Sequence, residues 1–173
     1  MKNILKYIKE NKHYLIFSFF VVSIMCWFGE MGYAYVIKNK SIFPGVLHGP
    51  WCPIYGSAFL VLIICHNEKE SKLKTLLKIF VTVVVVEYLA SYICEIVFKR
   101  RVWNYTNYPL DIDGRICLHM SLLFTTTAYI FMNYVEKSMK RFYNKLGSNV
   151  IIANIILSFI FVMDLLLTII TKF

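Results

Sequence analysis

Two glutamates and a serine lie four residues apart along an otherwise apolar stretch of the chain. Glu87, Ser91 and Glu95 occupy positions i, i + 4 and i + 8 among Val, Ile, Leu, Tyr and Phe residues. On a helix this spacing places all three side chains on one face, which we expect to meet protein or water rather than lipid. Two carboxylates one or two turns apart in a low dielectric resist joint ionisation. At least one of them is therefore expected to be protonated or paired with a cation.

Arg115 is the cation that we expect to pair with this stripe. It stands in the sequence DGRI at the start of a later apolar stretch, where it should reach the level of Glu95. A guanidinium binds a carboxylate through two N–H groups and remains charged when it is buried. Arg115 would therefore either lock two helices together or bind an anionic group of a solute.

Glu30 is a third carboxyl group within an apolar stretch, directly after the sequence IMCWFG. An ionisable side chain inside a membrane span is costly and is retained for a partner or a function. We expect Glu30, Glu87 and Glu95 to line a functional polar cavity. The alternative is that they make only structural hydrogen bonds or salt bridges, and Asp164, in the last apolar stretch, is open to the same two interpretations.

The segment HGPWCPIYG at residues 48–56 carries a thiol at the expected start of a helix. Pro53 suits the first helical position, so Cys52 would lie at the positive end of the helix dipole, which lowers the pKa of a thiol. With His48 four residues earlier, a Cys/His nucleophile is one interpretation. The other is that the Pro and Gly residues make a turn, while Cys52 packs as a small apolar side chain.

Aromatic residues of the same regions complete the candidate binding set, although Tyr and Trp are also typical of the membrane interface. The candidate substrate-binding residues are Glu30, Cys52, Tyr55, Glu87, Ser91, Glu95, Trp103 and Arg115. No catalytic residue is assigned. The spacing of Cys52, Cys94, Cys117, His48 and His119 matches no established ligand pattern, so no metal site and no cofactor are expected.

The elements that must position these residues are membrane helices. With 58% hydrophobic residues over 173 positions and a mean hydropathy of +0.60, the chain has more apolar surface than a soluble domain of this size can bury, so lipid must cover the rest. A spanning helix needs about 20 apolar residues. Candidate spans are residues 13–37, 53–66, 75–98, 116–135 and 149–170.

The second of these spans, residues 53–66, is too short to cross comfortably as a helix. The preceding residues 42–51 are also apolar and contain two Pro and two Gly residues. They could enter the membrane as irregular backbone, which is tolerated only where protein or a water-filled cavity shields it. The alternative is a short tilted helix behind an interfacial loop. The predicted fold is thus one all-α polytopic membrane helical bundle over residues 1–173, with about five transmembrane helices and a broken or re-entrant second span.

The net charge of +9 could suggest a nucleic-acid binder, but the 19 Lys and Arg residues lie between apolar segments. The expected partner is therefore a lipid bilayer and not a nucleic acid. With a cytoplasmic amino terminus, twelve basic residues fall on the inner side and seven on the outer side, as the positive-inside rule requires. Residues 38–51 and 99–114 then face outward.

Three ordered motifs carry a resemblance to a known family. They are GVLHGPWCPIYG at residues 45–56, EY at residues 87–88 followed by Ser91 and Glu95, and WNY at residues 103–105 followed by GRICL at residues 114–118. Over roughly residues 30–134 the chain resembles the ABC-transporter permeases of the CmpB type, which are bacterial membrane proteins. This resemblance implies a permease subunit of the bacterial cell membrane that works with an ATPase partner. The chain departs from the family pattern at His48, where an apolar residue is more common, and this counts against a His48–Cys52 pair.

Three functions follow from these residues. We favour a small permease-like protein that forms an outward-facing polar pocket for a small-molecule solute, which would not be an enzyme. The alternative is an integral-membrane enzyme acting on a lipid-linked or peptide substrate, with carboxylates as acid and base and Cys52 as nucleophile. The third is a structural or regulatory membrane partner whose polar residues serve packing. A homo-oligomer is compatible with each.

Overall fold

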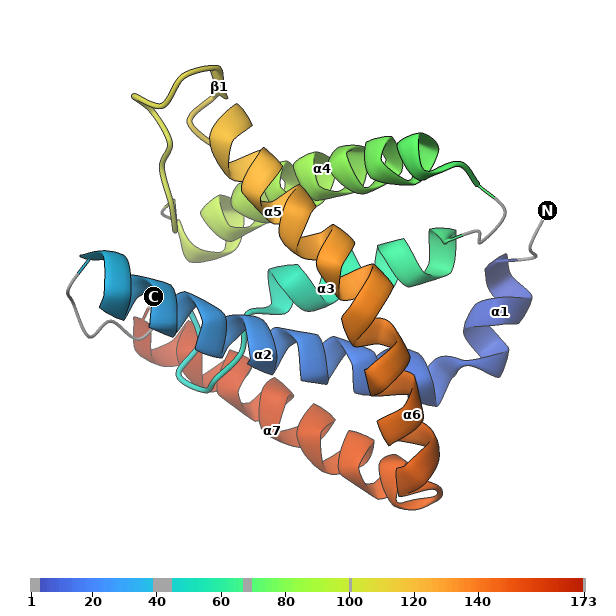
Figure 1. Cartoon of the computed structure of the whole chain (residues 1–173). Helices are drawn as coiled ribbons and strands as arrows, with labels where there is room; N and C mark the ends of the chain where they lie inside the picture. The colour runs from blue at the N-terminus through green and yellow to red at the C-terminus, as the bar shows by residue number, and fades with distance from the viewer. Residues whose placement is uncertain (1–3, 39–44, 67–69, 100, 173) are drawn as a thin grey trace. The chain divides into compact units, whose positions relative to one another are not determined.

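The computed structural model describes residues 4–38, 45–66, 70–99 and 101–172. Most of these residues are helical, and the only two strands among them, of two residues each, form a hairpin. In chain order the elements are α1 (Ile4–Glu10), α2 (Lys12–Lys38), α3 (Pro53–Cys65), α4 (Lys72–Phe98), β1 (Asp111–Ile112), β2 (Ile116–Cys117), α5 (Leu118–Ile130), the π-helical turn η1 (Phe131–Val135), α6 (Glu136–Leu146) and α7 (Asn149–Lys172) (Figure 1).

Three of the described helices are long and apolar enough to cross a membrane. The qualifying segments are Lys12–Val36 of α2, Lys72–Phe98 of α4 and Asn149–Thr171 of α7. The described residues that the protein buries within the α7 segment are Val150, Asn154 and Thr168, so most of this apolar surface needs lipid to cover it. These helices confirm an all-α membrane fold.

The two remaining predicted spans differ from this standard. The helix expected at residues 53–66 is α3, which is apolar but has only 13 residues. The span expected at residues 116–135 begins two residues late, because Ile116 and Cys117 form β2. Its helix then continues without interruption through η1 into α6 (Figure 1). A total of about five spans therefore remains a prediction.

The chain divides into two compact units. One unit consists of Met1–Ser57 together with Tyr143–Phe173, and the other is Ala58–Phe142. The boundaries fall inside α3 and α6. A single integral-membrane domain over residues 1–173 remains a prediction.

In the first unit, α2 and α7 lie side by side and run in the same direction (Figure 1). Asn154 of α7 donates a hydrogen bond to the carbonyl of His13 at 2.8 Å, and further along both helices Phe161 contacts Phe20 ring to ring. The non-helical residues 45–52 pack on this pair through apolar side chains. Leu47 and Trp51 are buried in a cluster with Phe20.

The start of α3 lies very close to α2. A side chain at Gly56 would collide with the hydroxyl of Ser23, and its Cβ would lie 2.7 Å from the carbonyl oxygen of Phe19. The N–H of Cys52 donates to the carbonyl of Ser23 at 3.1 Å. Glycine is therefore required where these two segments meet.

The second unit is built on the packing of α4 against α5. Leu62, Ile79 and Val83 form its buried apolar cluster. The hairpin β1–β2 precedes α5, with Ile112 opposite Ile116. This arrangement brings Arg115, between the two strands, to the carboxyl-terminal half of α4.

Candidate functional site

Glu95 and Arg115 form the ion pair that the sequence predicts. Nη2 of Arg115 donates to Oε2 of Glu95, and Nη1 of the same guanidinium donates to the hydroxyl of Ser91 at 3.2 Å. The faces of Tyr88 and Tyr92 lie within 5.9 and 5.3 Å of the guanidinium carbon. Arg115 is buried, so these contacts replace the water that its charge has lost.

A second layer of polar contacts lies at the exposed end of this pair. Arg101 donates to Glu95 at 3.3 Å and to the carbonyl of Asp113 at 2.9 Å. The hydroxyl of Tyr88 donates to the carboxylate of Asp113, also at 2.9 Å. Trp103, a predicted binding residue, donates its indole N–H to the carbonyl of Arg115 at 3.0 Å. Trp103 therefore fixes the backbone at Arg115.

Glu87 lies at the inner end of the same α4 face. Only 3% of the residue is exposed. The side chain of Tyr105 lies close enough to interact with the carboxyl group, but neither carboxyl oxygen makes a hydrogen bond of standard geometry to the described residues. Ser91, one turn away, is equally buried, and its hydroxyl accepts from Arg115. The predicted stripe thus has an ion pair at Glu95, whereas no ion pair among the described residues involves Glu87.

Glu30 takes its partners from the segment around the start of α3. The hydroxyl of Tyr55 donates to Oε1 of Glu30 at 2.5 Å, and the thiol of Cys52 donates to Oε2 at 3.5 Å. Cys52 and Tyr55 are three residues apart, so both side chains lie on one face of the turn that starts α3. These contacts tie α2 to α3 within the first unit.

The environment of Cys52 differs from that of an activated thiol. The residue is buried, and burial raises the pKa of the thiol, with the negative charge of Glu30 acting in the same direction. This is opposite to the shift expected from the helix dipole. His48 lies elsewhere, with its ring nitrogens facing Thr168 and Thr171. The geometry therefore gives no support to a Cys/His nucleophile.

Asp164 holds the residues before α3, a role that the sequence left undecided. Its two carboxylate oxygens accept the backbone N–H groups of His48 and Gly49, at 3.1 and 2.9 Å. The same carboxylate lies 3.5 Å from Nδ1 of His48, which is itself 2.9 Å from the hydroxyl of Thr168. Asp164 thus satisfies donors that the irregular backbone cannot pair within a helix.

The eight predicted binding residues therefore form two groups, one in each unit. Glu30, Cys52 and Tyr55 are in direct contact in the first unit. Glu87, Ser91, Glu95, Trp103 and Arg115 belong to the second unit, where Arg115 contacts three of the other four. Whether any of them binds a solute remains a prediction.

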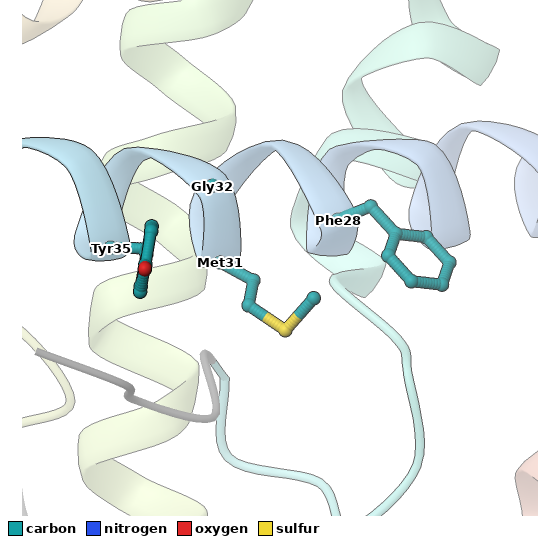
Figure 2. A pocket seen from close by; sticks show the side chains of 4 residues that line it. All are labelled: Phe28, Met31, Gly32 and Tyr35. Atoms are coloured by element: carbon teal, nitrogen blue, oxygen red, sulfur yellow. The ribbon is translucent and has the colours of Figure 1, made fainter.

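A separate small pocket lies on α2. It has a volume of about 300 Å³ and is lined by Phe28, Met31, Gly32 and Tyr35 (Figure 2). Figure 2 shows that the side chains around Gly32 all project from this one helix. None of the predicted binding residues lines it, and its walls are largely apolar, which is typical of a lipid-facing surface.

Apolar helices of spanning length and an ion-paired, buried polar stripe define a helical membrane protein. Residues 17–169 match the family described as "Putative ABC-transporter type IV" (ABC_trans_CmpB), and the chain belongs to this family. No curated protein and no solved structure shows significant similarity to it. The family confirms the resemblance seen in the three motifs.

Proposed function

We propose that the chain is a permease-like subunit of an ABC transporter in the bacterial cell membrane, with several spans and a cytoplasmic amino terminus. Its solute would enter a polar pocket that opens outward on the α4 face of the second unit. An ATPase partner would supply the energy, because the family name is that of an ABC transporter.

One observation carries this proposal: polar side chains continue along α4 from water into its centre. The side chains of Arg101 and Glu95 are 38% and 36% exposed, that of Arg115 is 8% exposed, and Ser91 and Glu87 are 1% and 3% exposed. Polar residues in a spanning helix are costly, and a graded series of them is typical of a solute or ion pathway. A helix that served packing alone would not need ionisable side chains at both its exposed and its buried level.

A binding screen on the purified protein tests the pocket. The protein would be reconstituted in lipid nanodiscs, and cationic, anionic and zwitterionic metabolites would be added in turn. The midpoint of thermal unfolding of the protein would be recorded with each. A ligand at 100 times its Kd stabilises the folded state by about 2.7 kcal/mol. We expect a solute of one class to raise the midpoint of wild type but not of Glu95→Gln. A shift that persists in this variant, or no shift with any class, would count against the pocket.

Transport distinguishes this proposal from the membrane enzyme. Cys52→Ser should retain uptake or growth at matched membrane expression, because a hydroxyl can donate to Glu30 as the thiol does. Glu95→Gln should impair it, since the amide keeps the shape and loses the charge. A folded but inactive Cys52→Ser protein, beside an active Glu95→Gln protein, would favour a thiol enzyme.

A further inference from the structure

The buried carboxyl of Glu87 lies deep in a spanning helix. It is 15 residues from the start of α4 at Lys72 and 11 from its end at Phe98, so roughly 16 Å of helix separates it from the nearer end. It is 3% exposed. Water therefore cannot solvate a charge at this position.

Among the described residues of the second unit, no cation forms an ion pair with this carboxyl. Arg101 and Arg115 are both bound to Glu95, and Lys78 is bound to Glu70 at 2.6 Å. Both oxygens of Glu87 lack a hydrogen bond of standard geometry to the described residues. An ionised carboxylate accepts about four hydrogen bonds and is poorly accommodated without them, whereas the neutral acid needs fewer and carries its own donor.

The titratable and charged groups around Glu87 do not supply the missing charge. On α4 itself Tyr88 and Glu95 follow it, and Tyr105 from the segment after α4 interacts with it. The packed elements α5 and β2 carry the exposed His119, the half-buried Tyr129 and the buried Cys117. Arg115, between the strands, and Arg101 are both bound to Glu95, and Arg115 is held at the level of Ser91 and Glu95.

We propose that Glu87 is a proton-binding site: its carboxyl group is neutral in the resting protein and takes up or releases one proton during the working cycle. Uptake converts the carboxylate to a carboxylic acid, with the proton arriving from water along the polar face of α4. Glu87, at the buried end of the stripe, thus binds a proton, while Glu95 remains ionised in its ion pair with Arg115. This inference concerns the same α4 face as the proposed function, but it does not require that a solute binds there.

Infrared spectroscopy of the purified protein in lipid tests the assignment without any transport. We expect a carbonyl stretch of a protonated carboxylic acid at neutral pH that shifts in deuterated water and is absent from Glu87→Gln. Glu70→Gln is the matched control, because Glu70 is ionised against Lys78; it should leave the acid band intact. If the difference spectrum between wild type and Glu87→Gln instead shows the loss of one carboxylate band, then Glu87 is ionised in wild type and the proposal is wrong.

Stability gives an independent readout. Glutamine has the shape of the neutral acid, so Glu87→Gln should unfold at the same temperature as wild type at neutral pH. When the pH is raised, the unfolding temperature of wild type should fall more than that of the variant, because only wild type must ionise Glu87. Marked destabilisation of this variant at neutral pH would overturn the proposal. Should that variant fail to fold at all, Glu87→Asp keeps the acid and moves its band, and an unmoved band would refute the assignment equally well. A solute screen that fails while the acid band of Glu87 is present would reject the pocket and leave the proton site standing.

Discussion

Removing the carboxylate of Asp164 should free the non-helical residues 45–52 from α7. Asp164→Ala deletes the acceptor of two backbone N–H groups, those of His48 and Gly49. Hydrogen bonds to a charged group contribute about 1.5–3 kcal/mol each, but water can replace the one at the exposed His48. We therefore expect the loss to be about 2–4 kcal/mol, smaller than two full bonds.

The buried apolar side chains of this segment set how the loss is expressed. Leu47 and Trp51 remain packed on Phe20, and each contributes about 1.5–3 kcal/mol by burial. The segment should therefore stay docked on average and open more often. A change of 2–4 kcal/mol multiplies the open population by about 30 to 700, at one factor of ten per 1.4 kcal/mol.

Cys52 reports this opening directly, because it is the last residue of the segment and only 4% of it is exposed. In a protein that keeps Cys52 as its single cysteine, the rate of maleimide labelling follows the open population when closing is fast. We expect Asp164→Ala to accelerate labelling by the factor given above. Asp164→Asn, which keeps one acceptor oxygen, should give about half the free-energy change.

Two controls make the result specific. Thr171→Val removes an exposed contact of 3.4 Å to His48 and a hydrogen bond of 2.8 Å to the carbonyl of Leu167 in its own helix. Neither holds a backbone N–H of residues 45–52, so this change should leave the labelling of Cys52 unchanged. A parallel protein with Cys117 as its single cysteine, which is 1% exposed in the other unit, reports global unfolding. If Asp164→Ala labels Cys52 no faster than Thr171→Val does, or accelerates Cys117 equally, the reasoning about the Asp164 contacts fails.

Three further predictions follow from the same contacts. Arg115→Ala should lower the free energy of unfolding by about 2–4 kcal/mol, less than for a fully buried pair because Glu95 is partly exposed. A double-mutant cycle with Glu95→Ala should show a coupling energy of about 1–2 kcal/mol in thermal or denaturant unfolding. Additive losses would mean that the two side chains do not stabilise each other. Gly56→Ala should cost about 1–3 kcal/mol by overpacking. Gly32→Ala, which would meet open space inside α2, should not lower the unfolding midpoint, because Ala favours the helix more than Gly does. Leu110→Cys, at a side chain that is 73% exposed, should react with an impermeant maleimide on intact cells if the segment between α4 and β1 faces outward; labelling only after permeabilisation would reverse the topology.

The long helices could be predicted because their apolar runs leave no other way to cover the surface. The pair of Glu95 and Arg115 could also be predicted, since a buried guanidinium needs a carboxylate and the two stand at the meeting ends of neighbouring apolar stretches. The strand at Ile116 could not, because its apolar side chains suit a span as well as a buried strand. The turn at Gly114, with φ of 63°, is the feature of the structure that makes Ile116 part of a strand rather than of the following helix.

The partners of Glu30 were missed for a different reason. From the sequence we expected Glu30 to lie with the other carboxyl groups, whereas in the structure it accepts hydrogen bonds from Cys52 and Tyr55. These contacts cross a non-helical segment, where helical periodicity says nothing about direction. A usable indication was present, because Cys52 and Tyr55 are hydrogen-bond donors one turn apart at the start of an otherwise apolar helix. Such a pair has to find an acceptor when it is buried.

Asp164 and Glu87 show why an acidic residue in a membrane helix has to be interpreted through its partners. Asp164 faces backbone N–H groups that exist in any non-helical segment, so side-chain patterns could not identify them, although irregular backbone beside a membrane always requires an acceptor. Its carboxylate accepts hydrogen bonds from two backbone N–H groups. An amide in its place has one acceptor oxygen and would leave one of these N–H groups without a hydrogen bond. Glu87 faces the side chain of Tyr105 but accepts no hydrogen bond of standard geometry from the described residues. An amide in its place keeps an oxygen that can face Tyr105, so it loses little that the neutral acid had. The same change from acid to amide should therefore destabilise the protein at Asp164 and be tolerated at Glu87, and the reverse order would mean that Glu87 is the ionised residue of the two.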